Sequence, residues 1–178
     1  PPIAETAELS RVQARASFGL AAHQTAFLFF GLVRPYKGLD ILLEAFSQLP
    51  AEAEAVLLIA GEPWSEAKES IEARLGEPDL QGRVVAKLEW IPDEQASVWH
   101  VAADVAVLPY RKATGSGVAA RALSFGLPMV ASAVGGLQEV IRGGETGLAV
   151  APGDVRGLRQ AMETMLSPEL RVRYGEAA

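Results

Sequence analysis

Several residue types and patterns that mark particular protein classes are missing from this chain. It has no cysteine and only two histidines, His23 and His100, which excludes disulfides and thiolate metal sites and argues against a His-rich site. Its net charge of -6 comes without a block of Lys and Arg, which argues against nucleic-acid binding by phosphate neutralisation. The apolar runs are too short to span a bilayer. We therefore expect no metal, no nucleic-acid partner and no integral membrane segment.

What the chain does contain is typical of a globular domain with a substantial core. Its 178 residues are 49% hydrophobic and 21% charged, which suits one domain or a large fragment of a longer protein. It begins Pro1-Pro2-Ile3, without a methionine and without the basic and apolar regions of a signal peptide. We expect an excised piece of a cytoplasmic protein, and the lack of cysteine fits a reducing compartment.

Short apolar runs alternate with segments of helical periodicity along most of the chain. Residues 26–33 form a continuous apolar run, which suits a strand covered on both faces. Leu39, Leu42, Leu43 and Phe46 follow at helical spacing. Further strands are expected at 56–61, 83–88, 104–109, 128–132 and 146–150, and further helices at 65–75, 93–102, 116–125, 137–141 and after Asp154. This order predicts an α/β sandwich of three layers, with about six parallel strands and helices on both faces.

The two ends of the chain carry weaker patterns. Residues 5–20 indicate a polar, Ala-rich helix with Leu9, Val12 and Phe18 as its apolar points. At the other end, Pro168 is expected to end the last helix, and a short polar tail should follow.

Two cations follow the first predicted strand directly. Arg34 and Lys37 stand in a loop whose path is restricted by Gly31, Pro35 and Gly38. Parallel sheets bind ligands at the carboxyl edge of their strands, and phosphate oxygens need charged donors such as Arg and Lys. We interpret the pair as a phosphate site, and two solvated loop cations are the alternative.

A glycine-spaced turn leads from the fourth predicted strand into a helix. Gly115 and Gly117 let the backbone approach a ligand closely, and the first N–H groups of the helix, up to Val118, face the same edge. Ser116 is the expected N-cap, which uses only one of the free donors. The turn is therefore a second candidate for anion binding.

A third glycine turn and one acidic residue complete the candidates at this edge. Gly136, in a Gly-Gly pair, opens a short helix in which Glu139 either accepts hydrogen bonds from sugar hydroxyls or complements the helix dipole. Taken alone, the turn is more simply a tight connection. Glu62 follows Gly61 at a strand end and is a weaker candidate.

Catalytic side chains are not evident in the sequence. His100, beside Trp99, is expected to be a helix residue packed at the surface, and Asp104 a structural residue at a strand entrance. There is no Ser/His/Asp set and no pair of acid and base carboxylates, so we assign no catalytic residue.

Four segments, taken together and in order, resemble a known family. They are FFGLVRPYKGLDILLEAF (29–46), LLIAGEP (57–63), AADVAVLPYRKATGSGVAARALSFGLPMVASAVGGLQEV (102–140) and GGETGLAVAPGD (143–154). The chain thereby resembles the C-terminal, donor-binding domain of a retaining glycosyltransferase of GT-B architecture, from family 4 (glycosyl transferases group 1). The resemblance implies a linker and leading helix in residues 1–24. It implies a Rossmann-like nucleotide-sugar-binding domain, one half of a GT-B fold, in residues 25–178.

The resemblance also implies a substrate and a missing partner domain. The donor would be a UDP- or GDP-linked sugar held between two Rossmann-like domains, and the reaction would transfer a hexose to a glycan, lipid or other acceptor with retention. No metal or cofactor is implied, because cations and helix N-termini neutralise the leaving diphosphate. The resemblance implies that an acceptor-binding N-terminal domain precedes this one in the whole enzyme, so we expect the fragment alone to be inactive. Any peripheral attachment to the inner membrane would come through that domain.

The family's donor-binding residues map onto this sequence with one shift. Lys37 matches the diphosphate-binding lysine, whereas Leu32 stands where the matching arginine usually lies. Arg34 would share a face with Leu32 in a strand, and we expect it to take over the role. The resulting diphosphate set is Arg34, Lys37, Gly115, Ser116, Gly117 and Val118. The expected nucleotide or sugar contacts are Gly31, Gly61, Glu62, Ile91, Arg121, Gly136 and Glu139.

Two positions depart further from the family. Its paired glutamates, eight positions apart, are replaced here by Ala113 and Arg121. The second glutamate would accept hydrogen bonds from the ribose, and arginine has no acceptor. Backbone groups from Trp90 to Asp93, with the loop at Gly61, are expected to read the base.

These departures leave three interpretations. We favour a working transferase subfamily. The alternatives are a nucleotide-binding module without transferase activity and a sugar-nucleotide epimerase of GT-B type, which the RPYKG segment disfavours.

Overall fold

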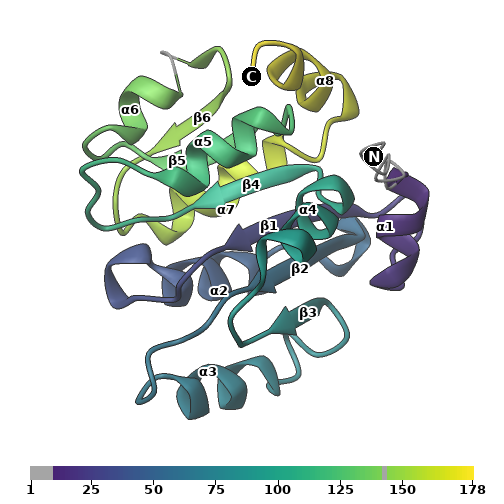
Figure 1. The fold of residues 1–178 in the computed structure, drawn as a ribbon, viewed down its shortest axis with the longest axis vertical. Helices are drawn as coiled ribbons and strands as arrows, with labels where there is room; N and C mark the ends of the chain where they lie inside the picture. Colours follow the sequence, from purple (N-terminus) through teal and green to yellow (C-terminus); the bar gives the residue numbers. More distant parts are fainter. Residues whose placement is uncertain (1–9, 142–143) are drawn as a thin grey trace, which may run out of the picture.

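The computed structural model describes residues 10–141 and 144–178, and a single parallel sheet lies at its centre (Figure 1). The six strands lie in the order β3-β2-β1-β4-β5-β6. Their bounds are β1 (Thr25–Phe30), β2 (Ala55–Ala60), β3 (Val84–Lys87), β4 (Val105–Leu108), β5 (Met129–Ser132) and β6 (Gly147–Val150). The strand order reverses between β1 and β4, which is the doubly wound, Rossmann-like arrangement. The predicted fold class is confirmed.

The strands are largely apolar because both faces of the sheet are covered. In β1, Ala26 and Leu28 belong to one buried cluster, and Phe27 and Phe29 belong to the other. This alternation follows from the two-residue period of a strand. The strand is shorter than predicted, because the backbone turns at Gly31 with a φ of 101°.

Helices cover both faces of the sheet. One buried cluster receives side chains from α1 (Arg11–Ser17), α4 (Asp93–Ala102), α5 (Gly117–Ser124) and α6 (Leu137–Val140). The other receives them from α2 (Leu39–Ser47), α3 (Lys68–Leu75), α7 (Val155–Thr164) and α8 (Pro168–Glu176). Two short 3-10 turns, η1 (Pro35–Lys37) and η2 (Ala51–Ala53), lie in the connections. Within the described residues, every helix is too short or too polar to cross a bilayer.

The two ends of the chain differ from the sequence-based expectation. Pro168 does not end a helix but opens α8, since the Ser167 hydroxyl accepts a hydrogen bond from the Leu170 N–H and proline is compatible with the first helical turn. In the leading helix, Val12 is exposed and Ala14 is buried instead. Residues 5–9 of the predicted helix, including Leu9, lie outside the described residues.

The amino-terminal edge of the sheet is held by one partly buried carboxylate. Asp104 accepts hydrogen bonds from Arg11 at 2.6 Å, from Arg15 at 3.0 Å and from the backbone N–H of Ala26 at 2.7 Å. These bonds join α1, β1 and the segment that enters β4. The structural role expected for Asp104 agrees with this geometry.

His100 was expected at the surface, but it is almost completely buried. Its ring lies 4.7 Å from the Phe30 ring and 5.0 Å from the Phe125 ring, between centroids. Burial lowers the pKa of His100, and its Nδ1 lies 2.8 Å from the Ala96 carbonyl oxygen. The residue is therefore a packed, neutral part of the core.

Candidate functional site

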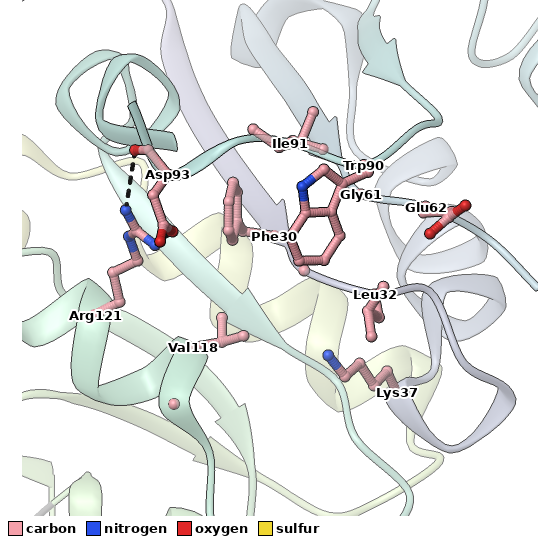
Figure 2. A pocket seen from close by; sticks show the side chains of 13 residues that line it. Phe30, Leu32, Lys37, Gly61, Glu62, Trp90, Ile91, Asp93, Val118 and Arg121 are labelled. Carbon is pink, nitrogen blue, oxygen red and sulfur yellow. Dashed lines mark hydrogen bonds and ion pairs between the residues drawn. The ribbon is translucent and has the colours of Figure 1, made fainter. Parts of the chain in front are cut away.

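A cavity of about 360 Å³ opens at the carboxyl edge of the sheet, beside the point where the strand order reverses. Residues at the ends of β1 and β2, from the segment between β3 and α4, and from the first turns of α5 line it (Figure 2). The lining is Phe30, Gly31, Leu32, Lys37, Ala60, Gly61, Glu62, Trp90, Ile91, Asp93, Gly117, Val118 and Arg121. Open parallel sheets bind ligands at this place.

Close backbone approach shapes the floor of the cavity and explains its glycines. A Cβ at Gly61 would collide with the carbonyl group of Gly31, so the loops after β1 and β2 touch only because Gly61 carries no side chain. Gly38 has a φ of 71°, and a Cβ there would collide with the Pro109 carbonyl oxygen. These contacts fix the turn η1, which carries Lys37.

Lys37 brings a nearly buried positive charge to the cavity. Its residue is 8% exposed, and Nζ lies 5.6 Å from the centroid of the Tyr110 ring. Among the described residues, no carboxylate oxygen lies within 4 Å of Nζ. Burial, and secondly the charge of Arg34, lower the pKa of Lys37. A buried cation without a counter-charge is costly, and an anionic ligand would offset that cost.

The N-terminus of α5 faces the same cavity. The Ser116 hydroxyl accepts a hydrogen bond from the Ala119 N–H at 3.2 Å, which confirms the predicted N-cap. Gly117 and Val118 line the cavity, and first-turn N–H groups have no partner within the helix. The cavity therefore combines a cation with helix donors, a combination that suits an anion.

At the other end of the cavity, Arg121 is paired with Asp93 (Figure 2). Arg121 Nη1 donates to Asp93 Oδ1 at 3.0 Å, and the guanidinium lies 5.7 Å from the centroid of the Phe30 ring. Arg121 has no acceptor of its own, but it holds a carboxylate at the cavity. Asp93 was expected to open a helix and to read the base through its backbone, so the role of its side chain at the cavity was missed.

Comparison with known proteins decides the family. Residues 24–168 match the family model described as glycosyl transferases group 1. This chain belongs to the group 1 glycosyl transferases. A D-inositol 3-phosphate glycosyltransferase from Mycobacterium sp. (strain KMS) is 34% identical over 160 residues, which are 88% of this chain and 36% of the relative. One from Rhodococcus opacus (strain B4) is 32% identical over 185 residues, with 96% and 41% covered.

Solved structures show the same fold, in one case as part of a longer chain. Sucrose-phosphate synthase from Thermosynechococcus elongatus superimposes with a TM-score of 0.83 at 32% identity, over 93% of this chain and 42% of that one. The C-terminal domain of a group 1 glycosyl transferase from Francisella tularensis superimposes with a TM-score of 0.81 over 94% of this chain and 88% of that one. At 18% identity, the second likeness shows the fold alone. The chain spans about two fifths of the length of the curated relatives named above.

The residues expected from the group 1 glycosyl transferases are only partly brought together. Lys37, Gly117, Val118 and Arg121 line the cavity, as do four other expected contacts, which are Gly31, Gly61, Glu62 and Ile91. Gly115 and Ser116 do not line it: Gly115 lies in a neighbouring hollow, and Ser116 caps the helix from outside. Whether any of these residues binds a donor stays a prediction.

Arg34 was expected to lie with Lys37 at the cavity, but it does not line the cavity. Its guanidinium lies 5.1 Å from the centroid of the Trp64 ring, and it lines a second hollow together with Glu66. The same-face argument was wrong because the strand has already ended at Gly31, and only Val33 beyond it makes a bridge, to Pro63. Leu32 lines the cavity in its stead.

The third glycine turn lies beside the cavity without lining it. Gly135 and Gly136 pack against the backbone of the loop before α5, where a Cβ at Gly136 would stand 3.0 Å from the Thr114 carbonyl oxygen. Glu139 is exposed. The expected sugar contacts at Gly136 and Glu139 therefore lie outside the cavity described above.

Proposed function

We propose that this domain binds the nucleotide-diphosphate-sugar donor, as the C-terminal domain of a retaining glycosyltransferase that transfers a hexose. The observation that carries the proposal is the unpaired, nearly buried Lys37 in the same cavity as the first turn of α5. Both features favour the diphosphate of a UDP- or GDP-linked sugar. Membership in the group 1 glycosyl transferases supports the reaction class.

In this proposal, the domain stabilises the leaving group. Negative charge grows on the diphosphate as the bond to the sugar breaks, and Lys37 with the N–H groups of Gly117 and Val118 stabilises that charge. These donors are fixed before the reaction, so the chemistry needs no metal or cofactor for this task. Asp93, held by Arg121, supplies the carboxylate that accepts a hydrogen bond from the ribose.

The acceptor is bound by the rest of the chain in this proposal. This chain covers 36 to 41% of two relatives that are named D-inositol 3-phosphate glycosyltransferase, which makes that compound the first acceptor to assay. A glycan or lipid acceptor is tested next. We place the whole enzyme in the cytoplasm, with any membrane attachment through the N-terminal half.

Calorimetric titration with UDP and GDP tests donor binding. We expect one nucleotide to bind the domain, and Lys37→Met to weaken that binding by about 10- to 150-fold, the effect of one charge-assisted hydrogen bond. Lys112→Met is the matched control, because Lys112 is an exposed lysine that lines a different hollow at this edge. Equal losses in both variants, or no binding of either nucleotide, would contradict the proposal.

A nucleotide-binding module without transferase activity is the second candidate. It is favoured by Ala113 and Arg121, which stand where the family's two glutamates are expected. The domain joined to its natural N-terminal half is incubated with radiolabelled UDP- and GDP-sugars. Transfer to an acceptor supports the transferase, binding without turnover supports the module, and an epimerised product would support an epimerase.

A further inference from the structure

Trp90 is an indole that the fold leaves unpacked at the cavity. It is 64% exposed, and of the large apolar side chains exposed in the described parts of the chain it alone lines the cavity. Figure 2 shows its ring on the side of Gly61 and Ile91, apart from the Arg121–Asp93 pair. An exposed indole is a large apolar surface that a flat ligand could cover.

The backbone, and not the indole's own packing, holds Trp90 in this place. Ile91, the next residue, is 7% exposed and belongs to the core cluster under α4 and α5. Pro92 then caps α4 with a φ of -59°. The ring is therefore presented from a fixed segment, so stacking on it needs little reordering of the chain.

We propose that the Trp90 indole stacks on the nucleobase of the donor. The inference rests on the proposed function. Lys37 and the start of α5 hold the diphosphate in the middle of the sheet edge, so the nucleoside and the sugar extend from it in different directions. The loops after β2 and β3, where Gly61 and Trp90 lie, are on one side, and those after β4 and β5 are on the other. The flat base is the part of the donor that covers an indole most completely.

Trp90→Ala, with Trp64→Ala as matched control, tests the stacking. Both side chains are exposed at this edge, but Trp64 packs on Arg34 outside the cavity. We expect Trp90→Ala to weaken binding of the preferred nucleotide by about 5- to 150-fold and Trp90→Phe to weaken it less, because phenylalanine keeps a π-face. Pyrophosphate, which lacks the base, should bind the wild type and Trp90→Ala equally.

Tryptophan fluorescence gives an independent reading. Nucleotide should change the emission of the wild type and of Trp64→Phe. It should leave the emission of Trp90→Phe unchanged, because of the two remaining tryptophans Trp64 lies outside the cavity and Trp99 is buried in the core.

The outcomes separate the two proposals. Tight nucleotide binding that survives Trp90→Ala would overturn the stacking and leave donor binding intact. An equal loss for nucleotide and pyrophosphate would also overturn it, because Trp90 would then act on the shape of the site. A wild type that binds neither UDP nor GDP would contradict the proposed function and this inference together. Circular dichroism confirms that each variant is folded.

Discussion

At the scale of single residues, the site depends on where one ammonium group is placed. Lys37 is held over the Tyr110 ring by a turn that exists only because Gly38 adopts a left-handed conformation. Burial removes most of the water that would otherwise solvate the charge, and this lowers the pKa of Lys37. The charge is therefore poised to gain from a phosphate, which replaces the lost water.

Nucleotide affinity should fall as the pH rises, and earlier than for an ordinary lysine. The lowered pKa means that Lys37 loses its proton below the usual 10.5, and the neutral amine no longer attracts the diphosphate. Calorimetry from about pH 7 to pH 10 should show this fall in the wild type and a flatter profile in Lys37→Met. Identical profiles would mean that Lys37 does not contact the ligand.

The same lowered pKa has an opposite effect on the unliganded fold. The unfolded chain holds the proton more strongly than the folded one. The contribution of Lys37 therefore makes the protein more stable as the pH rises through the folded-state pKa. A bound anion that pairs with the Lys37 ammonium raises the pKa of Lys37 towards its unfolded value. It should therefore reduce this dependence of stability on pH.

The sequence predicted that Lys37 lies at the cavity, but it did not predict the position of Arg34. Lys37 could be found because glycines and a strand end mark the loop, and those signals are local. Arg34 could not be placed, because its direction depends on Trp64, thirty positions further along the chain. Asp93 and Trp90 were missed as side chains for the same reason: a helix start and an exposed indole carry no local sign of a cavity.

At the scale of elements, the loops that connect helices and strands restrict the choice of residue more than the helices and strands do. Gly38 ends η1 and also caps α2, and its α-carbon faces the Pro109 carbonyl at the end of β4. The loop after β1 and the loop after β4 are thus in backbone contact. Any side chain at this position would push them apart.

Gly38→Ala should destabilise the domain more than Gly82→Ala. Both glycines have a positive φ, 71° and 77°, but a Cβ at Gly82 meets nothing within 4 Å. Gly82→Ala should therefore cost about 1–2 kcal/mol of unfolding free energy, from the left-handed conformation alone. Gly38→Ala adds the collision with Pro109 and should also weaken nucleotide binding, because Lys37 is its neighbour. Urea unfolding measures both variants, and equal losses would contradict the steric argument.

The ends of the helices and strands show which bounds a local sequence pattern can predict and which it cannot. The strands were found to within a few residues, because a doubly covered strand is a run of apolar residues whatever its neighbours are. Pro168 was misread, because proline both terminates helices and occupies their first turn. Ser167, which caps α8, was the local signal that separates the two cases.

At the scale of the whole molecule, two buried hydrophobic clusters and the ion pairs of Asp104 with Arg11 and Arg15 hold the layers together. The clusters lie on opposite faces of the sheet and involve every strand. Asp104 joins α1 to β1 and β4 at the edge opposite the cavity, with side-chain exposures of 13% for Asp104 and 8% for Arg15. The cavity at one edge of the sheet is thus accompanied by a hydrogen-bonded network at the opposite edge.

Asp104→Ala should destabilise the fold by about 3 kcal/mol, because it leaves the buried Arg15 without the carboxylate that balances its charge. Asp40→Ala is the control. Asp40 pairs with Arg111 at 2.6 Å, but the pair is exposed to solvent, and such pairs contribute about 0–1 kcal/mol. Chemical denaturation measures the unfolding free energy of both variants. A loss for Asp104→Ala no greater than that for Asp40→Ala would show that the ion pairs of Asp104 do not stabilise the fold.

The order of strands and helices, and so the parallel sheet, was determined by the sequence itself. Local apolar runs and glycine turns state which segments are covered and where the chain reverses, and chain order then leaves few topologies. Which of the expected residues line the cavity together, and which other side chains join them, was decided only by the tertiary structure. It depends on contacts between segments far apart in the chain, such as Arg121 with Asp93, Arg34 with Trp64, and the glycine backbones of the loops after β1 and β2. Side-chain direction at a loop is set by what the fold places opposite it, and no local pattern records that.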